Sequence, residues 1–156
     1  EAKSAVAKAT ERKFLGFSFY RYKGQVKRCV ARKAVQAYKD RVRQLTRRSG
    51  GKSIEQVVEK LRTYQLGWKN YFRLSETPRV FLGLDEWLRH RLRVIHLKHW
   101  KRGKTAYAEL IKLKASPSDA AKVAQNMRCW WVNGMRRLNR ALPISYFDRL
   151  GVVRLS

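Results

Sequence analysis

The apolar and polar side chains of residues 13–30 alternate, and this pattern predicts a pair of β-strands. One face of the first strand carries Leu15, Phe17 and Phe19, and the other carries Phe14, Gly16, Ser18 and Tyr20. Lys23-Gly24 supplies the turn between the two strands. Inside such a strand, Gly16 indicates a bulge or a close approach of another part of the chain.

After residue 30 the apolar spacing changes to three and four, which is the spacing of an amphipathic helix. We expect a first helix that ends at Gly50-Gly51, a second that opens at a Ser53/Gln56 capping box, and a third that opens at Thr77-Pro78. The predicted apolar stripes are Ala31, Val35, Tyr38, Val42 and Leu45 in the first helix; Ile54, Val57, Val58, Leu61, Trp68, Tyr71 and Phe72 in the second; and Phe81, Leu84, Leu88, Leu92 and Ile95 in the third.

The remaining third of the chain has weaker periodicity. Residues 101–104 read as a basic loop, followed by a short helix over residues 105–114 and a break at Ser116-Pro117. Ser118 or Asp119 is the expected cap of a further helix that runs toward Trp130. The predicted fold is therefore mainly α, with an N-terminal β-hairpin, a three-helix bundle and a smaller helical C-terminal segment.

Charge changes this picture more than composition does. The 156 residues contain 37 Lys and Arg but only 11 Asp and Glu, a formal net charge of +26 that is spread along the chain. So much like charge favours a polyanionic partner, and nucleic acid leads because phosphate neutralisation releases counterions. A membrane is not the expected partner, since no apolar run approaches the roughly 20 residues that a spanning helix needs.

Few residues suggest catalysis or metal binding. We expect Asp85 and Glu86 to form ion pairs with Arg89 and His90 along one helix. His96 and a third-helix neighbour, His99, have the spacing of a shared ligand face, but no nearby side chain completes a metal set, so a partly buried histidine is the favoured interpretation. Cys29 and Cys129 stand apart, which is typical of a reducing compartment. No metal site and no catalytic residue is predicted.

The basic residues form the candidate binding surface, because several basic pairs have few acidic neighbours. The predicted RNA-contacting residues are Lys27, Arg28, Arg32, Lys39, Arg43, Arg47, Arg48, Lys52, Lys69, Arg73, Arg89, Arg93, Lys101, Arg102 and Lys104. The aromatic residues Trp68, Tyr71 and Phe72 are assigned to the core in preference to base stacking.

Two strings in the sequence are specific. Phe14-Leu15-Gly16-Phe17, preceded by Lys3-Ser4, and residues 67–75 (GWKNYFRLS) together resemble the C-terminal part of group II intron reverse transcriptases. Residues 87–93 (WLRHRLR) and the ending, with Asn139-Arg140-Ala141-Leu142, are similar to the same family, so the resemblance covers nearly the entire chain.

The resemblance implies three regions: residues 1–30, the end of a polymerase palm with a primer-grip hairpin; residues 31–102, the thumb or maturase bundle; and residues 103–156, a helical extension that is a candidate for nucleic-acid binding. Phe14, Leu15, Gly16 and Phe17 take the primer-grip positions, and Gly67, Trp68, Tyr71 and Phe72 the maturase signature. The implied functions are stabilising intron RNA for splicing and clamping template–primer for reverse transcription during retrohoming.

The implied partners are group II intron RNA, target DNA as a further candidate, and the missing fingers and palm, in a bacterial cytoplasmic ribonucleoprotein. The palm carboxylates of the family, a Tyr-x-Asp-Asp motif, are absent from the sequence, so Mg²⁺ is expected in the ribozyme and in the palm but no cofactor is expected in this chain. We expect a chain that begins inside a longer protein or is a processed product. Two alternatives stay open: a generic scaffold for structured RNA, and the thumb of a CRISPR-associated reverse transcriptase.

Overall fold

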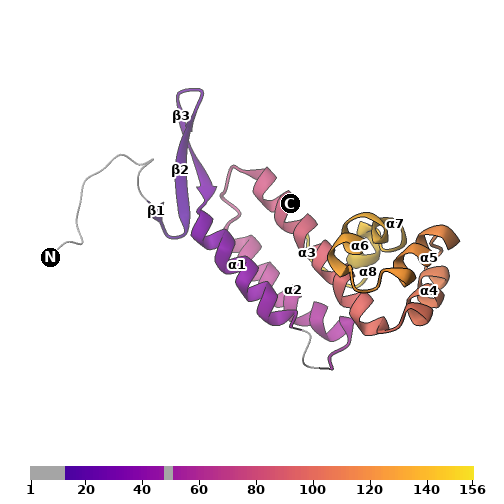
Figure 1. Ribbon diagram of the computed structural model, residues 1–156. Coiled ribbons are helices and arrows are strands. Elements are labelled where there is room, and N and C mark those ends of the chain that lie inside the picture. Colours follow the sequence, from indigo (N-terminus) through magenta and orange to yellow (C-terminus); the bar gives the residue numbers. More distant parts are fainter. Residues whose placement is uncertain (1–12, 48–50) are drawn as a thin grey trace.

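The computed structural model describes residues 13–47 and 51–156. A small antiparallel sheet lies at one end of the molecule, three long helices form its middle, and five short helices gather at the other end (Figure 1). The predicted fold class, mainly α with an N-terminal hairpin, is confirmed. Arg48 and the Lys3-Ser4 pair of the resemblance lie outside the described residues.

The sheet contains β1 (Lys13–Phe14), β2 (Phe17–Tyr22) and β3 (Gln25–Val30), in that order. The predicted turn at Lys23-Gly24 is confirmed, with positive φ angles of 47° and 78°. The continuous strand predicted through Leu15 and Gly16 is wrong, because these two residues also have positive φ, 48° and 78°, and form a second tight turn between β1 and β2.

The three long helices are α1 (Arg32–Leu45), α2 (Ile54–Tyr71) and α3 (Pro78–Trp100). The Ser53/Gln56 capping box is confirmed in both of its hydrogen bonds. Thr77 is the N-cap residue of α3 and Pro78 follows at its first position, although the Thr77 hydroxyl bonds to Ser75 instead of capping the helix. The first helix ends earlier than Gly50-Gly51, since Thr46 already caps it.

The C-terminal segment contains α4 (Gly103–Lys112), α5 (Pro117–Gln125), α6 (Trp130–Arg136), α7 (Leu138–Ala141) and α8 (Ile144–Arg149). Two predictions need correction here. Lys104 lies in the first turn of α4 instead of a loop. Ser116 caps α5 through a 3.1 Å bond from the Asp119 amide, so the cap is neither Ser118 nor Asp119.

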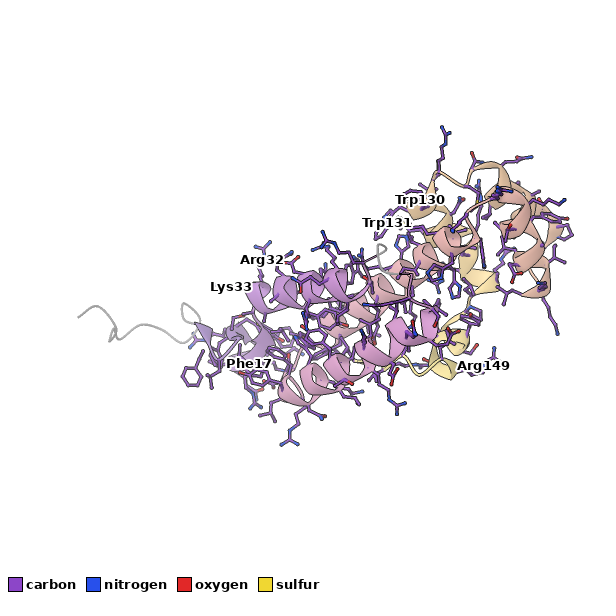
Figure 2. All side chains as sticks on the ribbon, turned by 90° about the horizontal axis from the view of Figure 1, so that it is seen from below. Phe17, Arg32, Lys33, Trp130, Trp131 and Arg149 are labelled. Carbon is purple, nitrogen blue, oxygen red and sulfur yellow. The ribbon has the colours of Figure 1, made fainter. Side chains whose placement is uncertain are left out.

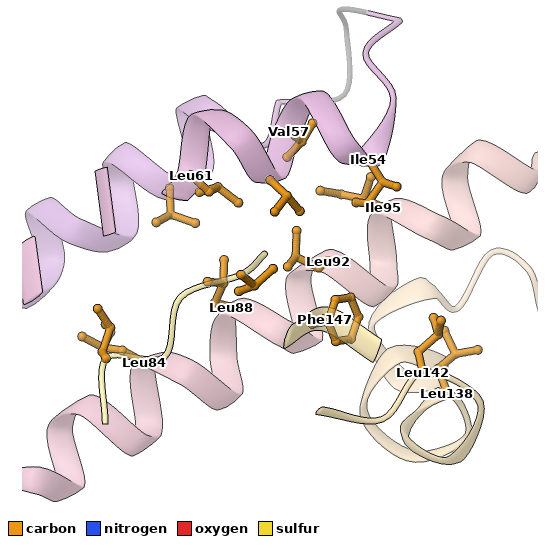
Figure 3. Close-up of a cluster of buried hydrophobic side chains, with 14 of the residues drawn as sticks. Ile54, Val57, Leu61, Leu84, Leu88, Leu92, Ile95, Leu138, Leu142 and Phe147 are labelled. Atoms are coloured by element: carbon orange, nitrogen blue, oxygen red, sulfur yellow. The ribbon is translucent and has the colours of Figure 1, made fainter. Parts of the chain in front are cut away.

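The core runs along α3. On one side, the leucines of α3 face Ile54, Val57 and Leu61 of α2, as Figure 3 shows. On the other side, Leu138, Leu142 and Phe147 of the C-terminal segment pack against the same helix (Figure 3). The predicted stripe of α3 is thus confirmed, but the helix also has a second buried face.

The last residues of the chain are fastened to the bundle. The carboxylate of Asp85, which is 2 % exposed, accepts hydrogen bonds from the amides of Leu155 and Ser156 and from the Ser156 hydroxyl at 2.8–3.1 Å. The predicted ion pair of Asp85 with Arg89 is present at 4.0 Å. The carboxylate of Glu86 is exposed, and His90 forms a hydrogen bond with the Trp131 carbonyl instead of the predicted ion pair with Glu86.

Candidate nucleic-acid interface

Three cations surround the indole of Trp87 where α1 faces α3. The ammonium of Lys39 and the guanidinium carbons of Arg43 and Arg91 lie 5.7, 5.6 and 6.0 Å from the ring centroid. Such contacts hold a cation over an aromatic face and leave it able to meet phosphate. We name these four residues the Trp87 cluster. The side chain of Arg91 also bonds to the Thr46 hydroxyl, which ties α3 to the end of α1.

A second basic feature, which we name the helix-end pocket, lies where α1 ends, α2 begins and α3 ends. Its cavity measures about 590 Å³, and four cations line it: Arg47, Lys52, Lys98 and Lys101. Val57 and Ile95 form an apolar part of the wall, and no carboxylate stands among the described residues that line it. A pocket of this composition suits an anion such as a phosphate group.

The electrostatics of the helix-end pocket favour anion binding in two further ways. The pKa of Lys52 is lowered because the nearby Lys60 side chain bonds to it and repels its charge, a repulsion that a bound anion would relieve. Ser53 places the N-terminus of the 18-residue helix α2 at the pocket, and the positive end of a helix dipole attracts anions. The buried ammonium of Lys98 has no hydrogen-bond partner among the described residues and lies 3.8 Å from the Trp130 ring centroid.

The structure brings some of the predicted RNA-contacting residues together and disperses others. Lys39 and Arg43 meet in the Trp87 cluster, and Arg47, Lys52 and Lys101 meet in the helix-end pocket. The other exposed members lie elsewhere on the surface: Arg28, Arg32, Arg73, Arg102 and Lys104. Lys27 and Lys69 are half-buried, and Lys69 donates to the Arg154 carbonyl at 2.7 Å.

The expected surface position of Arg89 and Arg93 is wrong. Both residues are 7 % exposed, because the C-terminal segment covers the face of α3 that carries them. Arg93 donates to the Leu142 carbonyl at 3.0 Å, and its guanidinium carbon lies 5.4 Å from the Phe147 ring centroid. The periodicity of α3 alone gives no sign of this second packing face.

Three contributors escaped the sequence reasoning: Arg91 in the Trp87 cluster, and Lys98 and His99 in the helix-end pocket. The available signal for the pocket was the closeness in sequence of Lys98, in the last turn of α3, and Lys101, the residue that caps the helix. His99 is exposed, so the favoured interpretation of a partly buried histidine does not hold for it, whereas His96 is buried against Tyr146, Phe147 and Trp100. Burial, chiefly, lowers the pKa of His96 to about 4.

The primer-grip-like residues are coupled to the end of α2. Phe17 packs on Tyr71 and Phe72, with ring centroids 6.2 and 5.1 Å away, while Phe14 and Leu15 are exposed. The Tyr71 hydroxyl donates to the Leu15 carbonyl at 2.9 Å. Trp68 and Phe72 are core residues as predicted, but Tyr71 is 53 % exposed, so its assignment to the core is wrong.

Figure 2 labels two basic residues of α1 and two aromatic residues of α6. Arg32 and Lys33 of α1 and Trp130 and Trp131 of α6 lie along the same edge in this view. In the described ranges, no group of three His, Cys, Asp or Glu side chains could hold a metal ion. Within the same ranges, each helix is too short or too polar to cross a bilayer.

Comparison with the sequence models of known protein families identifies a domain in the chain. Residues 35–113 match the sequence model of a family described as "Group II intron, maturase-specific domain". The matched region is just over half of the 156 residues and contains both the Trp87 cluster and the helix-end pocket. It extends past the predicted boundary at residue 102 to the end of α4. No curated protein gives a significant match to the chain.

Proposed function

The chain belongs to the family of the group II intron maturase-specific domain, and from this premise we propose that it holds folded intron RNA through two basic features on its long helices. The observation that carries the proposal is the helix-end pocket, in which four cations converge without a carboxylate in the described lining. In this proposal the RNA performs the chemistry of splicing, and the protein stabilises its active fold.

Recognition in this proposal is mainly of RNA shape and backbone. Structured RNA offers a deep major groove that side chains do not reach and a continuous line of phosphates, so proteins read its surface and its unpaired segments. The Trp87 cluster and the helix-end pocket both involve α1 and α3, with the Arg91–Thr46 bond between them. A phosphate backbone lying along α1 would contact both features.

A second role follows from the same premise: a thumb that clamps the template–primer during reverse transcription. Its support is the coupling of the hairpin to the bundle, in which Phe17 packs on Tyr71 and Phe72 and the Leu15 carbonyl is held by Tyr71. A primer bound against Phe14 and Leu15 would therefore act on the end of α2 through these contacts. The fingers and palm of the polymerase are the partners this role requires.

The test is binding of the chain to a folded group II intron RNA over a series of salt concentrations, in competition with an unrelated structured RNA of equal length. We expect the intron RNA to keep its advantage as salt rises, because a fitted surface loses only its electrostatic part to screening. Equal competition at every salt concentration would contradict the maturase role. It would favour the scaffold alternative, which the dispersed cations Arg28, Arg73 and Arg102 support.

A further inference from the structure

A large cleft opens beside the contact between α3 and the C-terminal segment, and the proposed function assigns it no role. Its volume is about 930 Å³, within the range of small-molecule sites. Trp87, Arg89 and Arg93 of α3 line one side, and Met135 and Ile144 line the other. We name it the α3 cleft.

The apolar side of the α3 cleft is exposed to solvent. Met135 and Ile144 are 55 % and 46 % exposed, although both are large apolar residues next to a buried core. Pro143 extends this wall, and Trp87 stands opposite. Flat apolar walls of this kind suit a planar ring.

The polar side of the α3 cleft carries both hydrogen-bond donors and an acceptor. Arg93 has no carboxylate partner in an ion pair among the described residues, and the buried Nε of Arg89 has no hydrogen-bond partner there. Burial and the charge of Arg89 lower the pKa of Arg93 to about 10, so it stays charged at neutral pH. Glu86, also in the lining, adds a carboxylate acceptor.

This mixture points to a base and away from a phosphate. Three guanidiniums, Arg89, Arg93 and Arg154, and the carboxylate of Glu86 line the cleft, so charge alone would also admit a phosphate. A phosphate gains nothing from the exposed apolar wall, whereas a nucleobase can pack its ring on that wall and pair its edge with arginine and carboxylate side chains. A guanidinium group such as those of Arg89 and Arg93 can also stack on a base. The cleft therefore matches a nucleobase in size, in wall chemistry and in polar groups.

Trp87 connects the cleft to the cations that lie between α1 and α3. Its ring is surrounded by Lys39, Arg43 and Arg91, and its side chain also lines the cleft. We propose that the α3 cleft receives one unpaired nucleobase of the RNA whose backbone lies on the Trp87 cluster, an inference that rests on the proposed function. The cleft would then read an extruded nucleotide, while the cluster holds the phosphates beside it.

The experiment compares the affinities of the full chain for short RNA duplexes by fluorescence anisotropy. One duplex is perfectly paired, four contain a single unpaired nucleotide with each of the four bases, and one contains an abasic nucleotide at the same place. We expect at least one base-containing bulge to bind about tenfold more tightly than both the paired and the abasic duplexes, because stacking contributes that much per base. Equal affinity for all six duplexes would overturn the inference.

Gly83→Leu tests whether the cleft is the site. Gly83 lines the cleft, and a side chain added to it meets no atom within 4 Å, so the leucine would fill the opening without a clash. Leucine also favours the helix over glycine, so thermal unfolding should show a protein at least as stable. We expect the preference for the bulge to fall below about twofold, as removal of the stacking contact requires.

The matched control is Ala108→Leu, which adds an exposed leucine to α4 and should keep the full preference. A Gly83→Leu variant that keeps the preference would place the base elsewhere and overturn the inference. Failure of the proposed function is a separate result: it appears as loss of the wild-type advantage of intron RNA over unrelated RNA, whatever the duplexes show.

Discussion

Asp85 joins the middle of α3 to the end of the described chain. Its carboxylate is buried beside Arg89 and accepts three hydrogen-bonding groups from Leu155 and Ser156. Gln65 and Lys69 of α2 hold the carbonyls of Val153 and Arg154, so side chains of two helices fasten the same short segment. A buried carboxylate with donors on every side is costly to remove, because each donor then loses its partner.

We expect Asp85→Ala to lower the free energy of unfolding by about 2–4 kcal/mol, since it leaves the buried Leu155 amide without an acceptor and the buried Arg89 guanidinium without its ion-pair partner. Urea unfolding followed by circular dichroism measures the change. Glu109→Ala is the control: it removes an exposed pair with Lys112 and should cost less than about 1 kcal/mol. Equal losses in the two variants would show that Asp85 does not fasten the segment.

His96 gives the protein a stability that depends on pH. Its pKa is about 4 in the folded chain against about 6.5 when unfolded, so the unfolded state binds the proton more tightly. The contribution is complete above pH 6.5 and is lost as the pH falls toward 4, to a total of about 3 kcal/mol at most. We expect the measured free energy of unfolding to decrease as the pH is lowered from 6.5 to 4.

His96→Phe should flatten that pH dependence, because phenylalanine fills the space beside Tyr146 and Phe147 but does not titrate. Some slope remains, since burial also lowers the pKa of His90. His99→Gln should weaken the dependence only in part, because the charge of His99 is a smaller cause of the lowered pKa of His96 than burial is. A His96→Phe variant with the full wild-type slope would assign the dependence to other groups.

At the scale of elements, the sheet meets the bundle through one turn. The Leu15-Gly16 turn presents its glycine to the Phe72 ring, with a hypothetical Cβ 3.2 Å from the ring, while the Gly16 carbonyl accepts from the Ala31 amide at 2.9 Å. The turn thus contacts both the start of α1 and the end of α2. We therefore expect a substitution in this turn to disturb both helices.

Gly16→Ala and Gly24→Ala form a matched pair that tests this contact. Both glycines have φ of +78°, which costs an alanine about 1–2 kcal/mol, but only at Gly16 does the added carbon meet another side chain. We expect amide hydrogen exchange at Ala31, measured by NMR, to accelerate more in Gly16→Ala than in Gly24→Ala. Equal acceleration would mean that Phe72 yields without cost.

The elements that sequence predicts well are those with local signals. The capping box at Ser53, the proline that opens α3 and the turn at Lys23-Gly24 depend on neighbours in the chain, and all three are confirmed. The Leu15-Gly16 turn was hidden because leucine rarely adopts positive φ. The second buried face of α3 was hidden because it depends on residues some 45 positions away, such as Leu138 and Phe147.

At the scale of the whole molecule, the charge of +26 is a property that sequence gives directly, but its arrangement is not. The helix-end pocket brings together Arg47, Lys52 and Lys101. In the sequence, α2 and α3 lie between Lys101 and the other two residues. Conversely, Arg89 and Arg93 contribute to the net charge, but their side chains are buried. Counting basic residues favours a polyanionic partner, whereas only the packing of the three helix ends shows that some of these residues share one pocket.

The salt dependence of RNA binding tests that arrangement. Each phosphate contact that a cation makes adds about 0.7–0.9 to the slope of log affinity against log salt concentration. We therefore expect Lys52→Gln and Lys101→Gln, both in the helix-end pocket, each to reduce the slope for intron RNA by about one contact while weakening binding to every RNA sequence alike. Lys112→Gln is the control, because Lys112 already pairs with Glu109 at 2.7 Å outside the pocket. If the pocket variants and Lys112→Gln leave the same slope, the phosphates lie elsewhere on the surface, and the long-range field of the whole chain, which responds to any lost charge, accounts for the attraction.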